Sequence, residues 1–457
     1  ISVSGDNISI AAATDIRFTN SSGTWTGSVP KIQHYGDHLY IVGGSNGIRF
    51  REGPTDRWDI NTDGHFVPRN DSQLDIGTNA LRVRNAYFDN LYGSGANLTS
   101  LPSSPPPNNF LINGAMQVNV RGTNHQTAGS FNPVTAAIYT LDRWKVLNAN
   151  SFDTDSAQVT QANGTTVNGF RNSIMMNIGN TETPSSNQVC GFQQKIEAQN
   201  LQSLAYGTSS AKTMTLSFWV YSNKTGTYCV QLIQDDATKY VLYEYTISSS
   251  NTWEKKTITI AGNTANAIND DTGVGLNVNW ILCVGSGRQV SATSSWASGG
   301  SYYATSNQVN LWDDADNYVR LTGCQLEIGT TATEYEHTTF GEELALCQRY
   351  FFQVQGDSGD RVAIGGYATH GSEARLDAVF PVTMRTNPTI SGTGSAQFDA
   401  QTDSADFNCS SLTIDSTPTG LVSGIGLQIA TSGMTGGQSG GIRFRENSST
   451  ISFSAEL

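Results

Sequence analysis

Residues 321–352, LTGCQLEIGTTATEYEHTTFGEELALCQRYFF, are the stretch in which the periodicity of the sequence changes from that of strands to that of a helix. Leu344, Cys347 and Phe351 are spaced i, i+3 and i+7, which places them on one face of a helix. The residues before and after this stretch show the alternation of strands. The sequence therefore predicts a short helix near 342–350 that closes one β-domain and leads into another.

Thr339 and Glu342 mark the expected start of this helix. They are three residues apart, which is the spacing of a capping box. In that motif the Thr and Glu side chains each satisfy a backbone N–H at the helix start. We therefore expect the helix to begin directly after Thr339.

The composition predicts an all-β protein. Charged residues make up only 14% of the 457 residues, whereas glycine alone contributes 46. Sequences rich in Gly, Ser, Thr and Asn suit short strands joined by tight turns. Disorder is the competing interpretation of such a polar chain, but 8 Trp, 17 Tyr and 18 Phe residues indicate real hydrophobic cores. At this length we expect two to four domains.

The net charge of −13 argues against polyanionic partners. An acidic surface repels phosphate backbones and anionic membranes, so we expect no nucleic-acid binding. No run approaches the ~18 apolar residues of a membrane span, so we expect no membrane insertion. No signal peptide is recognisable, and the first residue, Ile1, suggests the distal part of a longer or processed polypeptide.

Six cysteines, at positions 190, 229, 283, 324, 347 and 409, are widely spaced and form no C-x-x-C pair. The histidines are scattered as well, so we expect neither a structural zinc site nor a disulfide framework. The cysteines are expected to be buried free thiols. We expect no metal site and no cofactor.

Residues 1–107 consist of short alternating runs separated by turn signals, as in HLYIVGGSNGIRFRE at 38–52. None of these runs has enough apolar residues to enclose a core of its own. Such a segment normally gains burial from identical copies, so we expect an intertwined homotrimeric β-stalk. Flexible hairpins are the alternative. Pro102 and the triple proline at 105–107 predict a stiff linker that ends this segment.

Residues 108–340 predict a β-sandwich. Residues 214–220 alternate between apolar side chains and Thr, Ser or Trp219, which indicates a half-buried strand. Residues 278–283 are largely apolar on both faces, so this strand should be central. Many such strands with turns between them indicate a sandwich, and a jelly roll of the carbohydrate-binding type fits best.

Candidate ligand-binding residues lie in the Ser/Gly-rich loop at 291–307. Trp296, Tyr302 and Tyr303 supply flat rings that could stack on sugar C–H faces, beside hydroxyl and amide groups for the sugar hydroxyls. The alternative is that these rings pack against the end of the sandwich or a neighbouring subunit.

The acidic residues give little support for catalysis or metal binding. Glycoside cleavage generally uses two carboxylates on a rigid scaffold, and the candidate pairs are all typical of turns or exposed strands. Motifs for a nucleophile elbow, zinc protease or P-loop are absent. We therefore expect no enzyme and no catalytic residue. The groups considered are Glu334 with Glu336 and His337, Asp235 with Asp236, and, for calcium or catalysis, Asp313 with Asp314 and Asp316.

Residues 341–457 predict a short helix followed by a small distal β-sandwich tip. Seven short strands are expected after the helix, in the segments 350–355, 360–368, 374–384, 411–415, 421–430, 441–446 and 450–457.

Several motifs resemble segments of bacteriophage tail-fibre and receptor-binding proteins, including those of marine and cyanobacterial phages. They are the QLE-G-x-x-A-T-x-Y-E run at 325–336, GEELALCQRYF at 341–351, N-x-LINGxM-x-VNVRG at 109–122 and YTLDRW at 139–144. WDI-x-x-x-G-x-F-x-P at 58–68 and LDIG…NAYFDN at 74–90 resemble fibre repeats. Met116 and Val120 stand where the family usually has an aromatic residue and Gln.

This resemblance implies a homotrimeric tail fibre with a stalk (1–107), a jelly-roll module (108–340) and a distal tip (341–457). Its expected function is non-catalytic attachment to a polysaccharide or lipopolysaccharide of the host bacterium. A structural fibre segment or adaptor is the alternative, and a polysaccharide-degrading tailspike is the third. The expected location is the virion tail, assembled in the host cytoplasm, with other tail or baseplate proteins bound at the N-terminal end.

Overall fold

The computed structural model describes most of the chain from residue 109 onward and a smaller part of what precedes it. Contacts divide the chain into two compact units, Ile1–Thr99 and Ser100–Leu457. The expected linker at 102–107 and, apart from Ile76, the fibre-like motif at 74–90 lie outside the described residues. The described residues are 2–4, 7–9, 15–17, 31–35, 38–43, 46–70, 76, 109–122, 138–150, 157–167, 169–299, 301–392, 397–402, 405–416 and 422–457.

In the first unit, the described strands form three small antiparallel sheets. The first is a hairpin, and the other two have three strands each. The strands are β1 (Ser2–Ser4) with β2 (Asn7–Ser9); β3 (Asp15–Arg17), β4 (Lys31–Tyr35) and β5 (His38–Val42); and β6 (Ile48–Glu52), β7 (Thr55–Ile60) and β8 (Phe66–Pro68).

The sheet β6-β7-β8 leaves large apolar side chains in contact with solvent. Phe66 stacks on Trp58 with ring centroids 4.7 Å apart, yet it remains 54% exposed, and Phe50 remains 45% exposed. Of the residues in this unit whose burial is described, only Asp59 is buried, and it pairs with Arg49 at 2.9 Å. The described part of a single copy of this unit therefore encloses little of its apolar surface.

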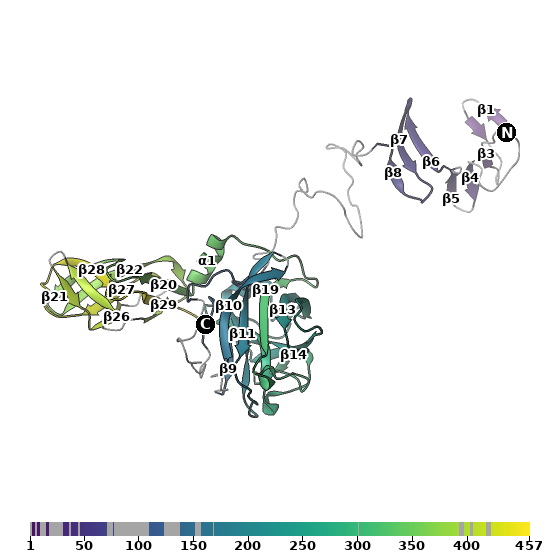
Figure 1. Ribbon diagram of the computed structural model, residues 1–457. Coiled ribbons are helices and arrows are strands. Elements are labelled where there is room, and N and C mark those ends of the chain that lie inside the picture. The colour runs from purple at the N-terminus through teal and green to yellow at the C-terminus, as the bar shows by residue number, and fades with distance from the viewer. Residues whose placement is uncertain are drawn as a thin grey trace. The chain divides into compact units, whose positions relative to one another are not determined.

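The second unit begins with a two-layer antiparallel sandwich (Figure 1). One layer is the five-stranded sheet β10-β11-β19-β13-β16, and the other is the six-stranded sheet β18-β15-β14-β17-β12-β9. The largest core lies between them and includes Trp144, Phe218 and Trp280. The prediction of an all-β protein with a jelly-roll-type sandwich is confirmed.

The jelly roll consists of antiparallel strands connected by loops and short 3-10 helices. The strands are β9 (Lys145–Ala149), β10 (Ala157–Val167), β11 (Phe170–Ile178), β12 (Val189–Glu197), β13 (Met214–Ser222), β14 (Gly226–Gln234), β15 (Lys239–Ile247), β16 (Glu254–Ile260), β17 (Val274–Val284), β18 (Thr293–Ser298) and β19 (Tyr318–Ile328), with the 3-10 helices η1 (Ala198–Leu204), η2 (Ser286–Arg288) and η3 (Leu311–Asp313).

Strands β13 and β17 show how the sequence pattern sets the layers. On β13, Leu216 and Phe218 point into the core, so Ser217 and Trp219 face outward, because side chains alternate along a strand. Strand β17 lies between β14 and β12, and its described residues after Val274 are all buried. The prediction of a central strand is confirmed. Strand β13 is more buried than the predicted half-buried strand, because Thr215 and Ser217 on its outer side are buried as well.

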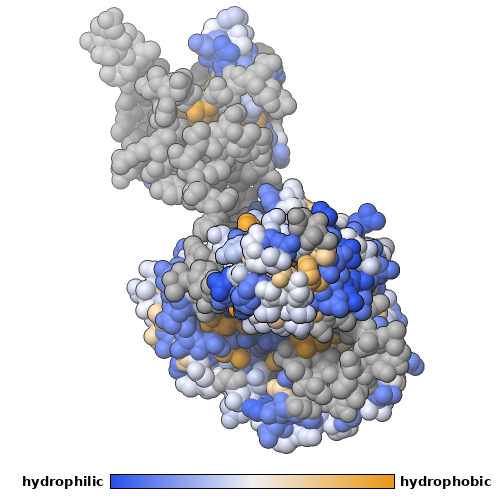
Figure 2. All heavy atoms as spheres, turned by 90° about the vertical axis from the view of Figure 1, so that its left-hand side faces the viewer, coloured by the Kyte–Doolittle hydropathy of each residue, from blue (hydrophilic) through white to orange (hydrophobic). Residues whose placement is uncertain are grey.

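The distal domain packs a seven-stranded sheet, β25-β24-β28-β21-β22-β27-β26, against a three-stranded sheet, β20-β29-β23. All seven predicted strands are present, and β23, β24 and β25 are additional. Most of the surface of this domain that Figure 2 shows is hydrophilic, with hydrophobic residues in small patches. The strands are β20 (Phe351–Gly356), β21 (Arg361–His370), β22 (Glu373–Met384), β23 (Thr389–Ser391), β24 (Phe398–Thr402), β25 (Asp406–Asn408), β26 (Ser411–Ser416), β27 (Val422–Ala430), β28 (Ser439–Phe444) and β29 (Ser449–Ser454).

Helix α1 (Phe340–Gln348) connects the two domains. Both hydrogen bonds of the predicted capping box are present, between Thr339 and Glu342. The helix ends at Gln348, before the predicted end at 350, and Phe351, which has the helical spacing of Leu344 and Cys347, begins β20. Cys347 is buried beneath the helix, and all six cysteines are free and buried, as predicted.

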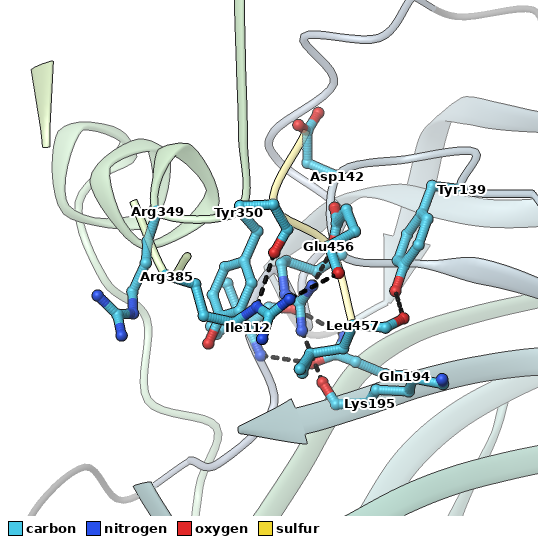
Figure 3. Close-up of polar contacts among 12 residues, drawn as sticks. Ile112, Tyr139, Asp142, Gln194, Lys195, Arg349, Tyr350, Arg385, Glu456 and Leu457 are labelled. Atoms are coloured by element: carbon cyan, nitrogen blue, oxygen red, sulfur yellow. Dashed lines mark hydrogen bonds and ion pairs between the residues drawn. The ribbon is translucent and has the colours of Figure 1, made fainter. Parts of the chain in front are cut away.

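Buried charges join the jelly roll to the distal domain (Figure 3). Arg143, whose side chain is 1% exposed, forms an ion pair with Glu456 near the C-terminus. Its guanidinium also lies 3.6 Å from the ring centroid of Tyr350. Arg349 donates two hydrogen bonds to the carboxylate of Glu197, at 2.7 and 3.0 Å. These contacts hold the start of the distal domain and its last residues against the same side of the jelly roll.

Candidate functional site

Trp296, one of the three rings predicted to bind a ligand, lies on the edge strand β18. Its indole Nε1 donates to the backbone oxygen of Ala261 at 2.8 Å, and its ring meets Tyr206 edge-on at 5.8 Å. The side chain is half-buried and packs against the core between the two sheets. The described structure therefore gives Trp296 a packing role.

Tyr302 and Tyr303 lie in a different environment. Tyr303 is half-buried against the small core on the outer side of the six-stranded sheet. Tyr302 is 39% exposed, and its ring centroid lies 6.2 Å from that of Tyr240. Trp296 packs against one core and Tyr303 against another, so the three predicted residues do not form one platform. Their role in binding stays a prediction.

The same loop does border a hollow, but polar residues line it. The hollow measures about 590 Å³, and its lining includes Glu244, Gln289 and Asn307. Asn307 donates to the carboxylate of Glu244 at 3.1 Å. None of the three predicted aromatic residues lines it.

A row of aromatic side chains lies instead on the outer side of the five-stranded sheet. Tyr221 on β13 packs against Trp253 at 5.2 Å and stacks on Tyr318 of β19 at 5.9 Å, between ring centroids. All three rings are half-buried. Trp219, two residues before Tyr221 on the same side of β13, extends the row.

The row continues across β19 to Phe170, Tyr335 and His337. The ring of Phe170 meets Tyr335 at 4.9 Å and His337 at 5.1 Å. Trp219, Trp253 and Tyr335 all pack against the buried cluster that contains Phe170. We call the set Phe170, Trp219, Tyr221, Trp253, Tyr318, Tyr335 and His337 the aromatic face.

Gly323 allows the rings of Phe170 and Trp219 to pack directly against the backbone of β19. Its φ is +58°, and an added Cβ would lie 2.6 Å from the Phe170 ring and 3.1 Å from the Trp219 ring. The register between β13 and β19 shifts at the same place, between Ser217 and Trp219. A glycine is therefore needed here both for the backbone conformation and for the close approach of the two rings.

A hollow of about 290 Å³ lies at the Phe170 end of the aromatic face. Burial raises the pKa of Tyr335 well above its usual value, so this hydroxyl stays protonated at neutral pH. The lining of the hollow consists of Ala115, Gln117, Gly169, Phe170, Arg171, Asn172, His337 and Phe340.

Polar groups stand among the rings. Tyr318 donates from its hydroxyl to Asn251 at 2.6 Å, and Arg320 donates from Nε to Ser173 at 3.1 Å. Strand register places Arg320 beside Tyr221, and Lys255 beside Trp219. Flat apolar rings with nearby hydrogen-bond donors are the chemical combination that binds sugar rings and orients them.

Three of the acidic candidates, Asp235, Asp236 and Asp313, make structural contacts. Asp235 accepts from Asn277 at 3.0 Å, and Asp236 accepts from Asn269 at 2.7 Å. Asp313 pairs with Lys224 and accepts from Asn317 at 2.8 Å. In the part of the chain that the structure describes, no group of His, Cys, Asp or Glu residues is arranged to hold a metal ion.

Sequence reasoning placed Trp219 correctly on the polar side of its strand but assigned it no function. The signal was a tryptophan among Ser and Thr residues on an outward face. The rest of the aromatic face comes from strands and loops that are distant in sequence, and no local pattern links them.

Among the described residues, no helix is long and apolar enough to cross a bilayer.

Comparison with known proteins gives structural likeness only. No protein-family model matches the chain, and no curated protein matches it. The structure is similar to the enzymatically active domain of bacteriophage CBA120 tailspike protein 4, with 13% identity and a TM-score of 0.25, over 49% of this chain and 22% of that chain. The chain thus spans about a fifth of that tailspike domain.

Two sugar-binding proteins are similar over their whole or nearly whole length. A putative sugar binding protein from Bacteroides thetaiotaomicron has 13% identity and a TM-score of 0.27, over 48% of this chain and 100% of that chain. A family 11 carbohydrate-binding module from Clostridium thermocellum, in complex with a mixed-linked tetrasaccharide, has 11% identity and a TM-score of 0.22, over 44% and 95%.

Proposed function

We propose that this chain is part of a bacteriophage tail fibre that attaches the virion to a glycan on the host cell without cleaving it. The observation that carries the proposal is the aromatic face on the outer side of the five-stranded sheet. The resemblance of the sequence motifs to phage fibre proteins supplies the biological setting. The ligand would be a polysaccharide or lipopolysaccharide of the bacterial surface.

The aromatic face suits a chain of sugars better than a compact small molecule. Tyr221 contacts both Trp253 and Tyr318, and Trp219 and Phe170 extend this group toward the hollow beside His337. Stacked aromatic rings contribute binding energy with little loss of side-chain entropy, because strands β13 and β19 already hold them in place.

Trimerisation of the N-terminal unit is the second part of the proposal. Ile41, Phe50 and Phe66 are 55%, 45% and 54% exposed in a single chain. Two further copies would bury these side chains and lower the free energy of the assembly. Three linked copies would also give avidity, so each glycan contact could be weak. Other tail or baseplate proteins would bind the N-terminal end.

Glycan-array and host-cell binding by the purified full-length protein test the proposal. Trp219→Ala should weaken binding about tenfold or more, because it removes a central ring. Trp296→Ala is the matched control, since this Trp is half-buried but lies on β18 and outside the aromatic face. If Trp296→Ala alone weakened binding, the site would belong to the loop at 291–307.

Two results would overturn the proposal. Native protein that retains no glycan and binds no host cell would favour a structural or adaptor role. Release of reducing sugar from host polysaccharide would contradict the non-catalytic assignment. For the stalk, light scattering should give three times the chain mass of 49.0 kDa, and a mass equal to one chain would exclude the trimer.

A further inference from the structure

Arg320 lies on the aromatic face, and none of the described residues offers it a carboxylate within ion-pair distance. Its side chain is half-buried beside Tyr221 and near Tyr318. A guanidinium has five N–H donors, and the described residues accept from two of its nitrogens, Nε to Ser173 at 3.1 Å and Nη2 to the backbone oxygen of Asn163 at 3.5 Å. Burial lowers the pKa of Arg320, and the two tyrosines oppose that shift.

Two other cationic side chains on this side of the sheet also lie in the described structure without a carboxylate partner. Lys255 is exposed and is paired across the strands with Trp219, and Arg171 is exposed at the hollow. Among the described residues neither has a carboxylate within ion-pair distance. The neighbouring Lys256, by contrast, pairs with Glu254 at 2.6 Å.

Carboxylates on the strands of this sheet are already engaged. Glu327 is 4% exposed and accepts from the backbone N–H and the hydroxyl of Thr333, at 2.9 and 2.7 Å. The exposed Glu334 and Glu336 flank Tyr335 at one end of the aromatic face. The centre of the face is therefore locally basic in a chain whose net charge is −13.

A half-buried cation beside aromatic rings is costly unless an anion or water completes its hydrogen bonds. An arginine also presents two parallel N–H groups that match a carboxylate or phosphate group. The general acidity of the chain repels polyanions from the rest of the surface. These facts together favour a ligand whose negative charge lies over Arg320.

We propose that the aromatic face selects glycans that carry carboxylate or phosphate groups, and that Arg320 is the residue that determines this specificity. The inference rests on the proposed glycan-binding function. Trp219 and Tyr221 would stack on the sugar rings, Arg320 would bind the anionic substituent, and Lys255 would add attraction beside it. Neutral glycans of the same backbone would lose the Arg320 contact and bind more weakly.

The test uses the full-length protein and an array of bacterial surface polysaccharides in matched pairs. Carboxylated polysaccharides are presented in native and carboxyl-reduced form, and phosphorylated ones before and after dephosphorylation, so the two sources of charge are separated. We expect the native member of a pair to bind at least tenfold more tightly than its neutral counterpart. Added salt should weaken the binding, since part of the contact is exposed.

Variants then assign the effect to Arg320. Arg320→Gln should reduce the preference for the charged member about tenfold, while Arg320→Lys should restore part of it through the retained charge. Lys255→Gln, at an exposed position, provides a second variant with little risk to the fold. Lys212→Gln, which removes one exposed charge away from the aromatic face, is the control and should leave the preference unchanged.

Each outcome bears on one proposal. Equal binding of charged and neutral members, lost in Trp219→Ala, would overturn the anionic specificity and leave the glycan-binding function intact. An undiminished preference in both Arg320→Gln and Lys255→Gln would also overturn it. If the native protein retained no polysaccharide at all, the proposed function itself would fall.

Discussion

Arg143 and Glu456 form an ion pair across the junction of the jelly roll and the distal domain, although they are 313 positions apart in the sequence. Arg121 reaches the same carboxylate at 2.6 Å, and the hydroxyl of Tyr139 donates to the backbone oxygen of Leu457 at 2.6 Å. Glu456 and Leu457 are thus held against the segment that precedes β9, the first strand of the jelly roll. These contacts join the distal domain directly to the module that carries the aromatic face.

Glu456→Gln should destabilise this junction. The substitution leaves the guanidinium of Arg143, at 1% exposure, without its counter-charge, and breaking one side of a buried pair costs about 3–5 kcal/mol. Thermal unfolding and limited proteolysis should show the distal domain released earlier than in the native protein. Glu446→Gln is the control, because Glu446 is exposed on the same domain. Equal stability of the two variants would contradict the structural role of Glu456.

Thr339→Ala should weaken helix α1. The hydroxyl of Thr339 accepts from the backbone N–H of Glu342 at 3.3 Å, and the Glu342 carboxylate accepts from the Thr339 N–H at 3.0 Å. Loss of an N-cap of this kind costs about 1 kcal/mol. Denaturant unfolding measures the change, and Thr331→Ala, at an exposed position outside the helix, should have no measurable effect.

Gly323→Ala should disturb the aromatic face specifically. The new Cβ would meet Phe170 at 2.6 Å while the backbone keeps a φ of +58°, so a loss of more than about 1 kcal/mol in unfolding free energy is expected. Glycan binding should fall with it. Gly341→Ala is the control, since an added Cβ there has open space at the first turn of α1. Unchanged packing and binding in Gly323→Ala would show that the rings of Phe170 and Trp219 do not pack directly against β19 at Gly323.

Alkaline pH should loosen the junction through Tyr350. Burial raises the pKa of Tyr350 to about 12, and its hydroxyl donates to Glu197 at 2.8 Å. An unfolded tyrosine ionises near pH 10, so between about pH 10 and 12 the unfolded state loses its proton first. Stability is therefore fully present below about pH 10 and falls by up to about 1.4 kcal/mol per pH unit above it.

Tyr350→Phe separates these effects. The ring stays beneath Arg143, but the hydrogen bond to Glu197 and the titrating hydroxyl are both lost. The variant should be less stable at pH 8 and should show a flatter decline between pH 10 and 12, measured by chemical denaturation. Tyr302→Phe, at a 39% exposed position, is the control. An identical decline in native protein and Tyr350→Phe would exclude Tyr350 as the source.

Local pattern in the sequence was sufficient for the elements. Alternation identified β13, the buried character of β17 and seven distal strands, and the spacing of Thr339 and Glu342 located the start of α1. Strands β23 and β25, with three residues each, are too short to show alternation, and they form because neighbouring strands offer free backbone groups. The low number of apolar residues in each run of residues 1–107 likewise indicated that one copy would leave apolar side chains exposed.

The candidate site required the tertiary structure. A Ser/Gly-rich loop with Trp296 and two tyrosines has the composition of a binding loop, but Trp296 packs against one core and Tyr303 against another, while Tyr302 stays 39% exposed. The aromatic face joins residues from β11, β13, β19 and two loops, and only the packing of these distant segments against one another brings the rings together. The sequence by itself determined which residues alternate and where strands and the helix occur, because those depend on neighbours along the chain. Which rings meet, and which cation lies among them, depends on contacts between distant segments, and only the folded structure decides this.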